Sequence, residues 1–178
     1  ASQLSEDSEL EAKTVYAVNK LACENYLDLY QRCFDIDYLI FRISLPYGSF
    51  IDNMKASHGV MSFLIENAQQ SKPLKMFGDG MQIGSFIHVS DLVDIILKGA
   101  LNESIKNEIF NVGGHDNLTM KKVMFEIASK FKVKVEQVDW PKLSGCVEHG
   151  DLILNSSKLE KATNFTYRYR FVQWLKNL

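Results

Sequence analysis

The stretch Tyr38-Leu-Ile-Phe-Arg-Ile-Ser44 is nearly continuous in apolar residues, and Pro46 and Gly48 follow it closely. An apolar run without polar alternation is typical of a strand buried on both faces, as in a parallel sheet covered by helices. The Pro and Gly then end the run. The stretch therefore predicts an α/β fold that contains a parallel sheet.

A long helix is predicted before this strand, over residues 11–34, which contain no Gly or Pro. Apolar side chains recur there at helical spacing in two rows. The first row is Val15, Val18, Ala22, Tyr26, Leu29 and Cys33, and the second row is Tyr16, Cys23, Leu27, Tyr30 and Phe34. Such a helix is expected to be buried on more than one side, inside the domain or at a subunit interface.

Short strands and helices are predicted after the strand, from apolar periodicity and from Gly and capping residues. Helices are expected over about 60–70 and 119–131, strands at 74–77, 85–89, 109–112 and 132–138, and short helices at 157 and 171–175. Ser90 and Thr119 are each expected to cap a helix, with Asp91 in the first turn after Ser90, and Ser157 with Glu160 is expected to form a capping box. A doubly wound domain normally opens with a strand and a Gly-rich turn, whereas this chain opens with a polar segment and a helix.

Composition excludes several functions. The net charge of −2 comes with no basic run, which disfavours nucleic acid and anionic membranes as partners, and no apolar stretch is long enough to span a bilayer. The histidines are scattered and no Cys pair has metal-ligand spacing, so no metal site is expected.

Cys23 and Cys33 would lie about 15 Å apart along one helix and cannot form a disulfide. Unpaired thiols suit a reducing compartment and predict a cytoplasmic location.

Tyr16 and Lys20 are the candidate catalytic pair, because four residues of spacing places them on one face of the helix. A phenol ionises near pH 10, too high for a general base at neutral pH, and a nearby ammonium favours the phenolate. The same spacing is common in a core tyrosine beside a solvated lysine. The pair therefore needs support from its surroundings.

That support is a resemblance to a known family. Thr14-Val-Tyr16-Ala-Val-Asn-Lys20-Leu-Ala-Cys-Glu24 resembles the catalytic helix of extended short-chain dehydrogenases/reductases, specifically the NAD-dependent nucleotide-sugar epimerase/dehydratase family. Five further segments resemble motifs of this family, in the family's order: Ser5–Ser8, Arg42–Gly48, Phe77–Gln82, Phe86–Leu92 and Phe110–Gly113. Together they cover nearly the whole chain.

The resemblance implies the C-terminal part of a Rossmann-type doubly wound sheet plus a smaller α/β substrate-binding region. Residues 1–48 would be the last part of the Rossmann-like domain with the catalytic helix. Residues 49–178 would be mainly the substrate-binding region, with some segments returning to the Rossmann sheet. The chain has no Gly-x-x-Gly-x-x-Gly turn for the cofactor pyrophosphate. The N-terminal, cofactor-binding half is therefore expected to be missing, and this fragment alone to be inactive.

By resemblance, Tyr16 would be the general acid/base of hydride transfer between NAD or NADP and a nucleotide sugar, in an epimerase, dehydratase or reductase. Lys20 would favour its phenolate and bind the nicotinamide ribose. Leu45 and Pro46 would flank the nicotinamide, and Leu45, Phe77 and Gly84 would contact the substrate. Relatives also commonly pair this helix across a two-fold axis, which predicts a homodimer with Cys23, Leu27, Tyr30 and Phe34 in the seam.

Three positions depart from the family pattern. Leu45 replaces an Asn that contacts substrate, Gly84-Ser85 replaces an Arg-Asp whose Arg holds the substrate diphosphate, and Val147-Glu-His149 lacks a second phosphate-binding Arg. Arg168, Arg170 or Lys142 would have to substitute. The departures leave two alternatives open: a non-catalytic relative with a regulatory or scaffolding role, and a dehydrogenase of this fold that acts on something other than an activated sugar.

Overall fold

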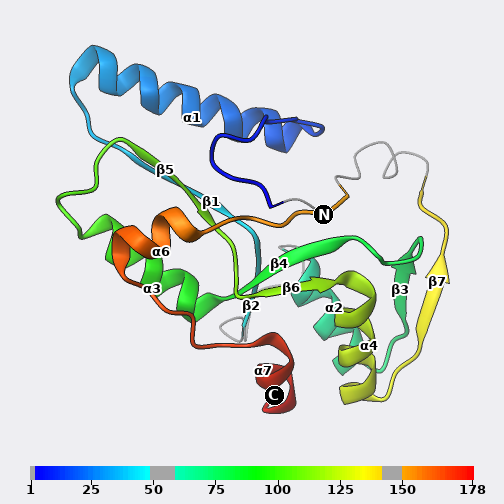
Figure 1. Ribbon diagram of the computed structural model, residues 1–178. Helices are drawn as coiled ribbons and strands as arrows, with labels where there is room; N and C mark the ends of the chain where they lie inside the picture. The colour runs from blue at the N-terminus through cyan, green and yellow to red at the C-terminus, as the bar shows by residue number, and fades with distance from the viewer. Residues whose placement is uncertain (1–2, 49–58, 142–149) are drawn as a thin grey trace.

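The computed structural model describes residues 3–48, 59–141 and 150–178. Its helices and strands are interspersed along the chain (Figure 1). In order they are α1 (Val15–Phe34), β1 (Leu39–Ile43), β2 (Leu45–Tyr47), α2 (Val60–Gln69), β3 (Leu74–Phe77), β4 (Ile83–His88), α3 (Val89–Ala100), β5 (Glu108–Val112), β6 (Asp116–Thr119), α4 (Met120–Phe131), β7 (Val135–Val138), α6 (Ser157–Thr163) and α7 (Phe171–Lys176). The predicted α/β class is confirmed.

The described strands form three small sheets, in the orders β1-β5, β2-β4-β6 and β3-β7. Three of the four pairings are parallel, and β4 with β6 is antiparallel. Segments far apart in sequence therefore lie side by side: β5 returns to β1, and β7 returns to β3. The parallel sheets that the apolar run predicted are confirmed.

The strand that decides the fold, β1, lies beside β5 with Phe41 opposite Phe110. Their rings stack at a centroid distance of 6.1 Å, and Phe110 belongs to the core formed with α3 and α6. The expectation that both faces of β1 are buried fails only at the end of the strand. Ile40 is 7% exposed on one face, whereas Ile43, which shares the other face with Phe41, is 45% exposed.

A second core lies between α2, α4 and α7 and the strands β2, β3 and β4 (Figure 1). Its fully buried side chains include Leu74, Phe86, Val123, Ile127 and Phe171. Apolar residues at helical spacing in α4 and the inward residues of β3 supply this packing, as periodicity predicts. Burying such side chains is the main favourable contribution to folding.

Capping differs from the prediction at two helices. His88 is the N-cap of α3, and its Nδ1 accepts the backbone N–H of Ser90, so Ser90 is already helical. The predicted capping box of α6 is wrong, because this helix has no side-chain cap bond. The hydroxyl of Ser156 instead accepts the backbone N–H of Gly113 at 2.6 Å. The predicted cap at Thr119 is confirmed, since its hydroxyl accepts the N–H of Lys122.

Within the described ranges, none of the helices is long and apolar enough to cross a membrane. Cys23 and Cys33 are exposed free thiols, which confirms that they do not pair. Cys146 lies outside the described residues.

Candidate active site

The candidate catalytic pair lies at the start of α1. The Thr14 hydroxyl accepts the backbone N–H of Ala17 at 3.0 Å and so fixes where the helix begins. Tyr16 follows in the first turn and Lys20 one turn later. The Lys20 Nζ lies 5.5 Å from the centroid of the Tyr16 ring, so the two side chains lie on one face.

Both polar groups of this pair are available to a ligand. Tyr16 is 71% exposed, and among the described residues neither its hydroxyl nor the Lys20 ammonium has a hydrogen-bond or ion-pair partner. An exposed phenol beside a free ammonium can exchange a proton with a bound hydroxyl and can donate to ribose hydroxyls. The donor set of this pair therefore fits a nicotinamide ribose and a sugar hydroxyl.

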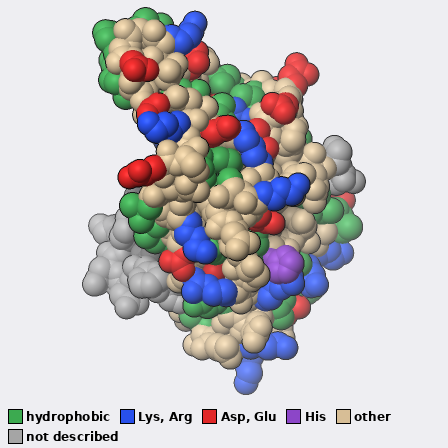
Figure 2. All heavy atoms as spheres, turned by 60° about the vertical axis from the view of Figure 1, so that its left-hand side comes forward, with side chains coloured by type: hydrophobic (Ala, Val, Ile, Leu, Met, Phe, Trp, Pro, Cys, Tyr) green, Lys and Arg blue, Asp and Glu red, His purple; other side chains and the backbone are tan. Residues whose placement is uncertain are grey.

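The helix that carries the pair is weakly packed. No residue of α1 is buried, and its half-buried side chains, such as Ala17, Leu21 and Gln31, follow the side turned toward the rest of the chain. Exposed apolar side chains lie on the projecting lobe at the top of Figure 2, together with charged ones. This lobe is the C-terminal part of α1, where both apolar rows end.

Leu45 and Gly84 are brought together by the pairing of β2 with β4. A Cβ at Gly84 would lie only 2.6 Å from Cδ1 of Leu45. The Leu45 side chain thus occupies the space into which a residue larger than glycine would begin to extend at position 84. The two departures from the family pattern, Leu45 and Gly84, are therefore neighbours in space. The Leu45 side chain packs against Gly84 at a place where the pattern has an Asn and an Arg.

Of the other predicted site residues, Pro46 lies beside Leu45, and Phe77 lies elsewhere. Pro46 is exposed on β2, next to Leu45, and pairs in register with Ile87. Phe77 ends β3 in a different sheet, where its ring stacks on Trp140 at 5.3 Å. Phe77 is thus held by a structural contact in this chain.

The two arginines that sequence offered as phosphate ligands are already paired. Arg168 binds Asp91 and Asp94, and Arg170 binds Asp116. Lys142 and residues 147–149 lie outside the described residues. Ser85 is fully buried, and its hydroxyl donates to Asn117 Oδ1 at 2.6 Å, so it has a structural role.

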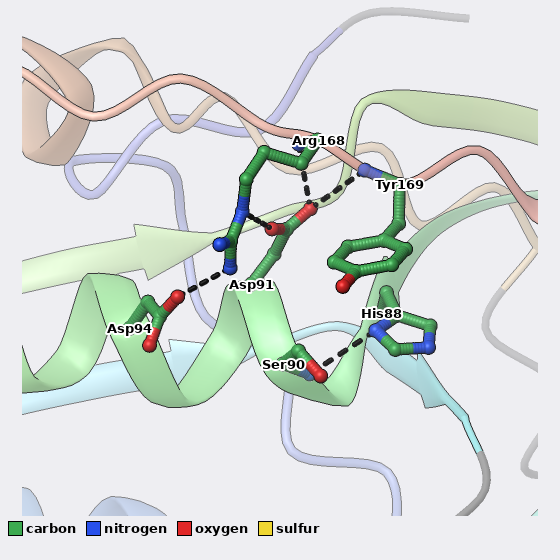
Figure 3. A network of polar contacts seen from close by, with 6 residues as sticks. All are labelled: His88, Ser90, Asp91, Asp94, Arg168 and Tyr169. Atoms are coloured by element: carbon green, nitrogen blue, oxygen red, sulfur yellow. Dashed lines mark hydrogen bonds and ion pairs between the residues drawn. The ribbon is translucent and has the colours of Figure 1, made fainter.

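A polar network that sequence reasoning missed lies at the start of α3 (Figure 3). Asp91 is 1% exposed, and its carboxylate accepts N–H bonds from Arg168 Nε and from the backbone of Arg168 and Tyr169. The Tyr169 ring stacks on His88 at 4.1 Å, and burial lowers the pKa of this histidine. The network fastens the C-terminal segment to α3. Its signal in the sequence was Asp91 in the His-Val-Ser-Asp motif.

Tyr47 packs edge-on against His88 with 5.3 Å between centroids. Its hydroxyl is buried without a partner among the described residues, and burial raises its pKa far above that of an ordinary phenol. A phenol that resists ionisation is a poor general base. Tyr16, not Tyr47, is therefore the better acid/base candidate. No group of His, Cys, Asp and Glu in the described part of the chain could hold a metal ion.

Comparison with known proteins gives the same family as the motifs. A model of the NAD dependent epimerase/dehydratase family matches residues 1–113. The chain is 29% identical over 172 residues to a putative UDP-glucose 4-epimerase from Methanocaldococcus jannaschii, a match that covers 91% of this chain and 53% of that protein. It is 25% identical over 138 residues to dTDP-glucose 4,6-dehydratase from Neisseria gonorrhoeae, covering 78% of this chain and 37% of that protein.

Solved structures share the fold at lower identity. A dTDP-glucose 4,6-dehydratase from Streptomyces venezuelae, solved with NAD, superposes with a TM-score of 0.86 at 20% identity and covers 99% of this chain and 53% of that one. A UDP-glucuronic acid 4-epimerase from Bacillus cereus, solved with UDP-glucuronic acid and NAD, gives 0.83 at 22% identity, with 99% and 55% covered. This chain thus spans about half the length of these proteins.

Proposed function

Because the chain belongs to the NAD-dependent epimerase/dehydratase family, we propose that it carries the catalytic helix of an enzyme that epimerises, dehydrates or reduces a nucleotide sugar. The observation that carries the proposal is the Tyr16–Lys20 pair, exposed and without polar partners among the described residues, at the start of a capped helix. The relatives named above act on such sugars by name, which supports the substrate class.

In this mechanism Tyr16 holds the proton that a sugar hydroxyl loses on oxidation and returns it on reduction. Lys20, whose Nζ lies 5.5 Å from the centre of the Tyr16 ring, supplies a positive charge beside the phenol and binds a ribose hydroxyl. A bound nicotinamide would supply hydride acceptance and donation. The contribution of this chain is to orient the sugar hydroxyl and to move its proton.

We propose that residues 1–48 belong to the cofactor-binding domain, and residues 49–178 mainly to the substrate-binding region, with β5 returning beside β1. The span of about half of the relatives' length, and the lack of a Gly-rich turn, support a cofactor-binding part N-terminal to this chain. The exposed thiols of Cys23 and Cys33 support a cytoplasmic location. We refer to this chain together with that part as the full-length protein.

The proposed separation of the cofactor-binding part from this chain predicts how tightly each protein binds NAD. This chain alone is expected to bind NAD at least about 100-fold more weakly than the full-length protein, because the backbone N–H groups that hold a pyrophosphate lie in the other part. Calorimetric titration of both proteins with NAD and NADP measures this and identifies the preferred cofactor. Equal micromolar affinity for the two proteins would contradict the proposal.

We also propose that the full-length protein is a homodimer through α1, whose two apolar rows are exposed in this chain. The second row begins with Tyr16, so its side of the helix must meet the cofactor-binding part. The first row lies about a third of a turn away. We therefore assign the two-fold seam to the first row, and not to the row with Leu27 that sequence analysis favoured.

Leu29→Glu in the first row is expected to weaken the dimer by about tenfold or more, because it places a charge in an apolar seam. Sedimentation of the folded variant measures the effect. Leu101→Glu, the same substitution at an exposed leucine that follows α3, is the control for added charge. Monomers from Leu27→Glu together with an intact dimer from Leu29→Glu would return the seam to the second row.

One observation favours a second candidate, a non-catalytic relative. The contact of Leu45 with Gly84 removes polar groups from the substrate side, and Arg168 and Arg170 are occupied by aspartates. A regulatory or scaffolding protein would tolerate such losses. The two candidates differ in turnover, because only the enzyme would convert a nucleotide sugar in the presence of NAD.

A further inference from the structure

The helix α1 has one strong polar attachment to the sheet. Arg42 on β1 donates from Nε to Glu24 Oε1 at 3.0 Å and from Nη2 to Glu24 Oε2 at 2.7 Å. This is a bidentate contact between the planar guanidinium and a carboxylate, which fixes orientation as well as distance. Both side chains are less than a fifth exposed. The pKa of Arg42 is raised, chiefly by the hydrogen bond to Glu24.

The same guanidinium also holds the segment that precedes α1. Its third nitrogen, Nη1, donates to the backbone carbonyl of Glu6 at 3.0 Å. The Glu6 carboxylate in turn accepts the backbone N–H of Asn111 at 2.8 Å, and the Asn111 amide donates to the Leu4 carbonyl. Arg42 and Asn111 lie opposite each other in the register of β1 and β5. The neighbouring residues Arg42 and Asn111 of the sheet thus both bind the N-terminal segment, and Arg42 also binds α1.

We propose that Arg42 is a positioning residue that, through Glu24 and Glu6, sets the rotation and height of α1 and so aims Tyr16 and Lys20 at the substrate. This inference rests on the proposed function of Tyr16. It adds a role for a residue that does not touch the reacting atoms.

The geometry makes the helix sensitive to this contact. Glu24 lies one turn beyond Lys20 and two turns beyond Tyr16, so a rotation of α1 at Glu24 moves all three side chains together. With a tyrosine hydroxyl roughly 8 Å from the helix axis, a rotation of about 10° displaces it by more than about 1 Å. A misplacement of about 1 Å can cost about 100-fold in rate.

Apolar packing does not replace the contact within this chain. No side chain of α1 is buried, so the van der Waals contacts that usually fix a helix's rotation are few. A lysine at position 42 would keep the charge but would lose the fork of donors. Arg42→Lys therefore tests the shape of the guanidinium separately from its charge.

The test uses Arg42→Lys and Glu24→Gln in the full-length protein, with steady-state kinetics on the sugar that the wild type converts. We expect each variant to lower kcat by about 10- to 100-fold and to leave KM and the NAD affinity within about threefold. Arg32→Lys and Asp28→Asn are matched controls, because that ion pair is confined to α1. Both controls are expected to keep the wild-type kcat.

Two results would overturn the inference. One is a wild-type kcat in both Arg42→Lys and Glu24→Gln, in a protein whose Tyr16→Phe variant is inactive. The proposed function would then stand without a positioning role for Arg42. The other is a kcat that falls only in proportion to the folded fraction at the assay temperature, since that is the effect of a purely structural ion pair. Full activity of Tyr16→Phe would instead refute the proposed function itself, and with it the positioning role of Arg42.

Discussion

Replacing Tyr16 by Phe in the full-length protein is expected to lower kcat by about 10²- to 10⁴-fold, the usual contribution of a general acid/base. The ring and its contact with Lys20 remain, and only the proton donor is lost. The affinity for NAD should therefore stay close to that of the wild type. Single-turnover measurements with bound cofactor separate the chemical step from binding.

Tyr26→Phe is the matched control for this variant. Tyr26 is also an exposed tyrosine of α1, but it lies in the first row and away from Lys20. Removal of its hydroxyl should leave kcat unchanged. Equal losses in the two variants would point to damage to the helix and not to loss of a proton donor.

Replacing Asp91 by Asn is expected to lower the free energy of unfolding by about 3 kcal/mol, because it removes a buried charge from its partners. The carboxylate accepts two backbone N–H bonds and the Arg168 Nε bond (Figure 3), and an amide can satisfy these donors only in part. Arg168 is half exposed, so most of the loss comes from the two backbone groups. Urea unfolding of variant and wild type gives the difference.

Asp94→Asn separates the buried carboxylate from the charge of its neighbour. Asp94 binds the same guanidinium but is nearly half exposed, so its loss should cost less than about 1 kcal/mol. If both variants lose the same stability, the exposed ion pair and not the backbone contacts would hold the C-terminal segment.

Local features of the fold could be predicted from the sequence because their causes are local. The spacing of Tyr16 and Lys20, the cap at Thr119 and the apolar run of β1 each depend on residues within a few positions. The strands β2 and β6 were missed because their residues do not resemble a strand: β2 is Leu-Pro-Tyr, and β6 is Asp-Asn-Leu-Thr. His88 was missed as the N-cap because histidine is rarely expected in that role.

Contacts between distant segments could not be predicted in the same way. Arg42 and Glu24 both belong to the recognised motifs, but only the docking of α1 on β1 shows that they bind each other. The contact of Leu45 with Gly84 requires the register of β2 against β4. Sequence suggested Arg168 as a phosphate ligand, because it could not show that Asp91 and Asp94 occupy that side chain.

The central claim is that Tyr16 serves catalysis on a nucleotide sugar. Its most direct test is to incubate the full-length protein and its Tyr16→Phe variant with NAD and either UDP-glucose or dTDP-glucose, the sugars in the relatives' names. Chromatography with mass spectrometry then detects an epimer, or a product that has lost water. The account predicts that the wild type converts at least one sugar and that the variant converts it about 100-fold or more slowly. A wild type that binds NAD but converts neither sugar, or a variant as fast as the wild type, would contradict it.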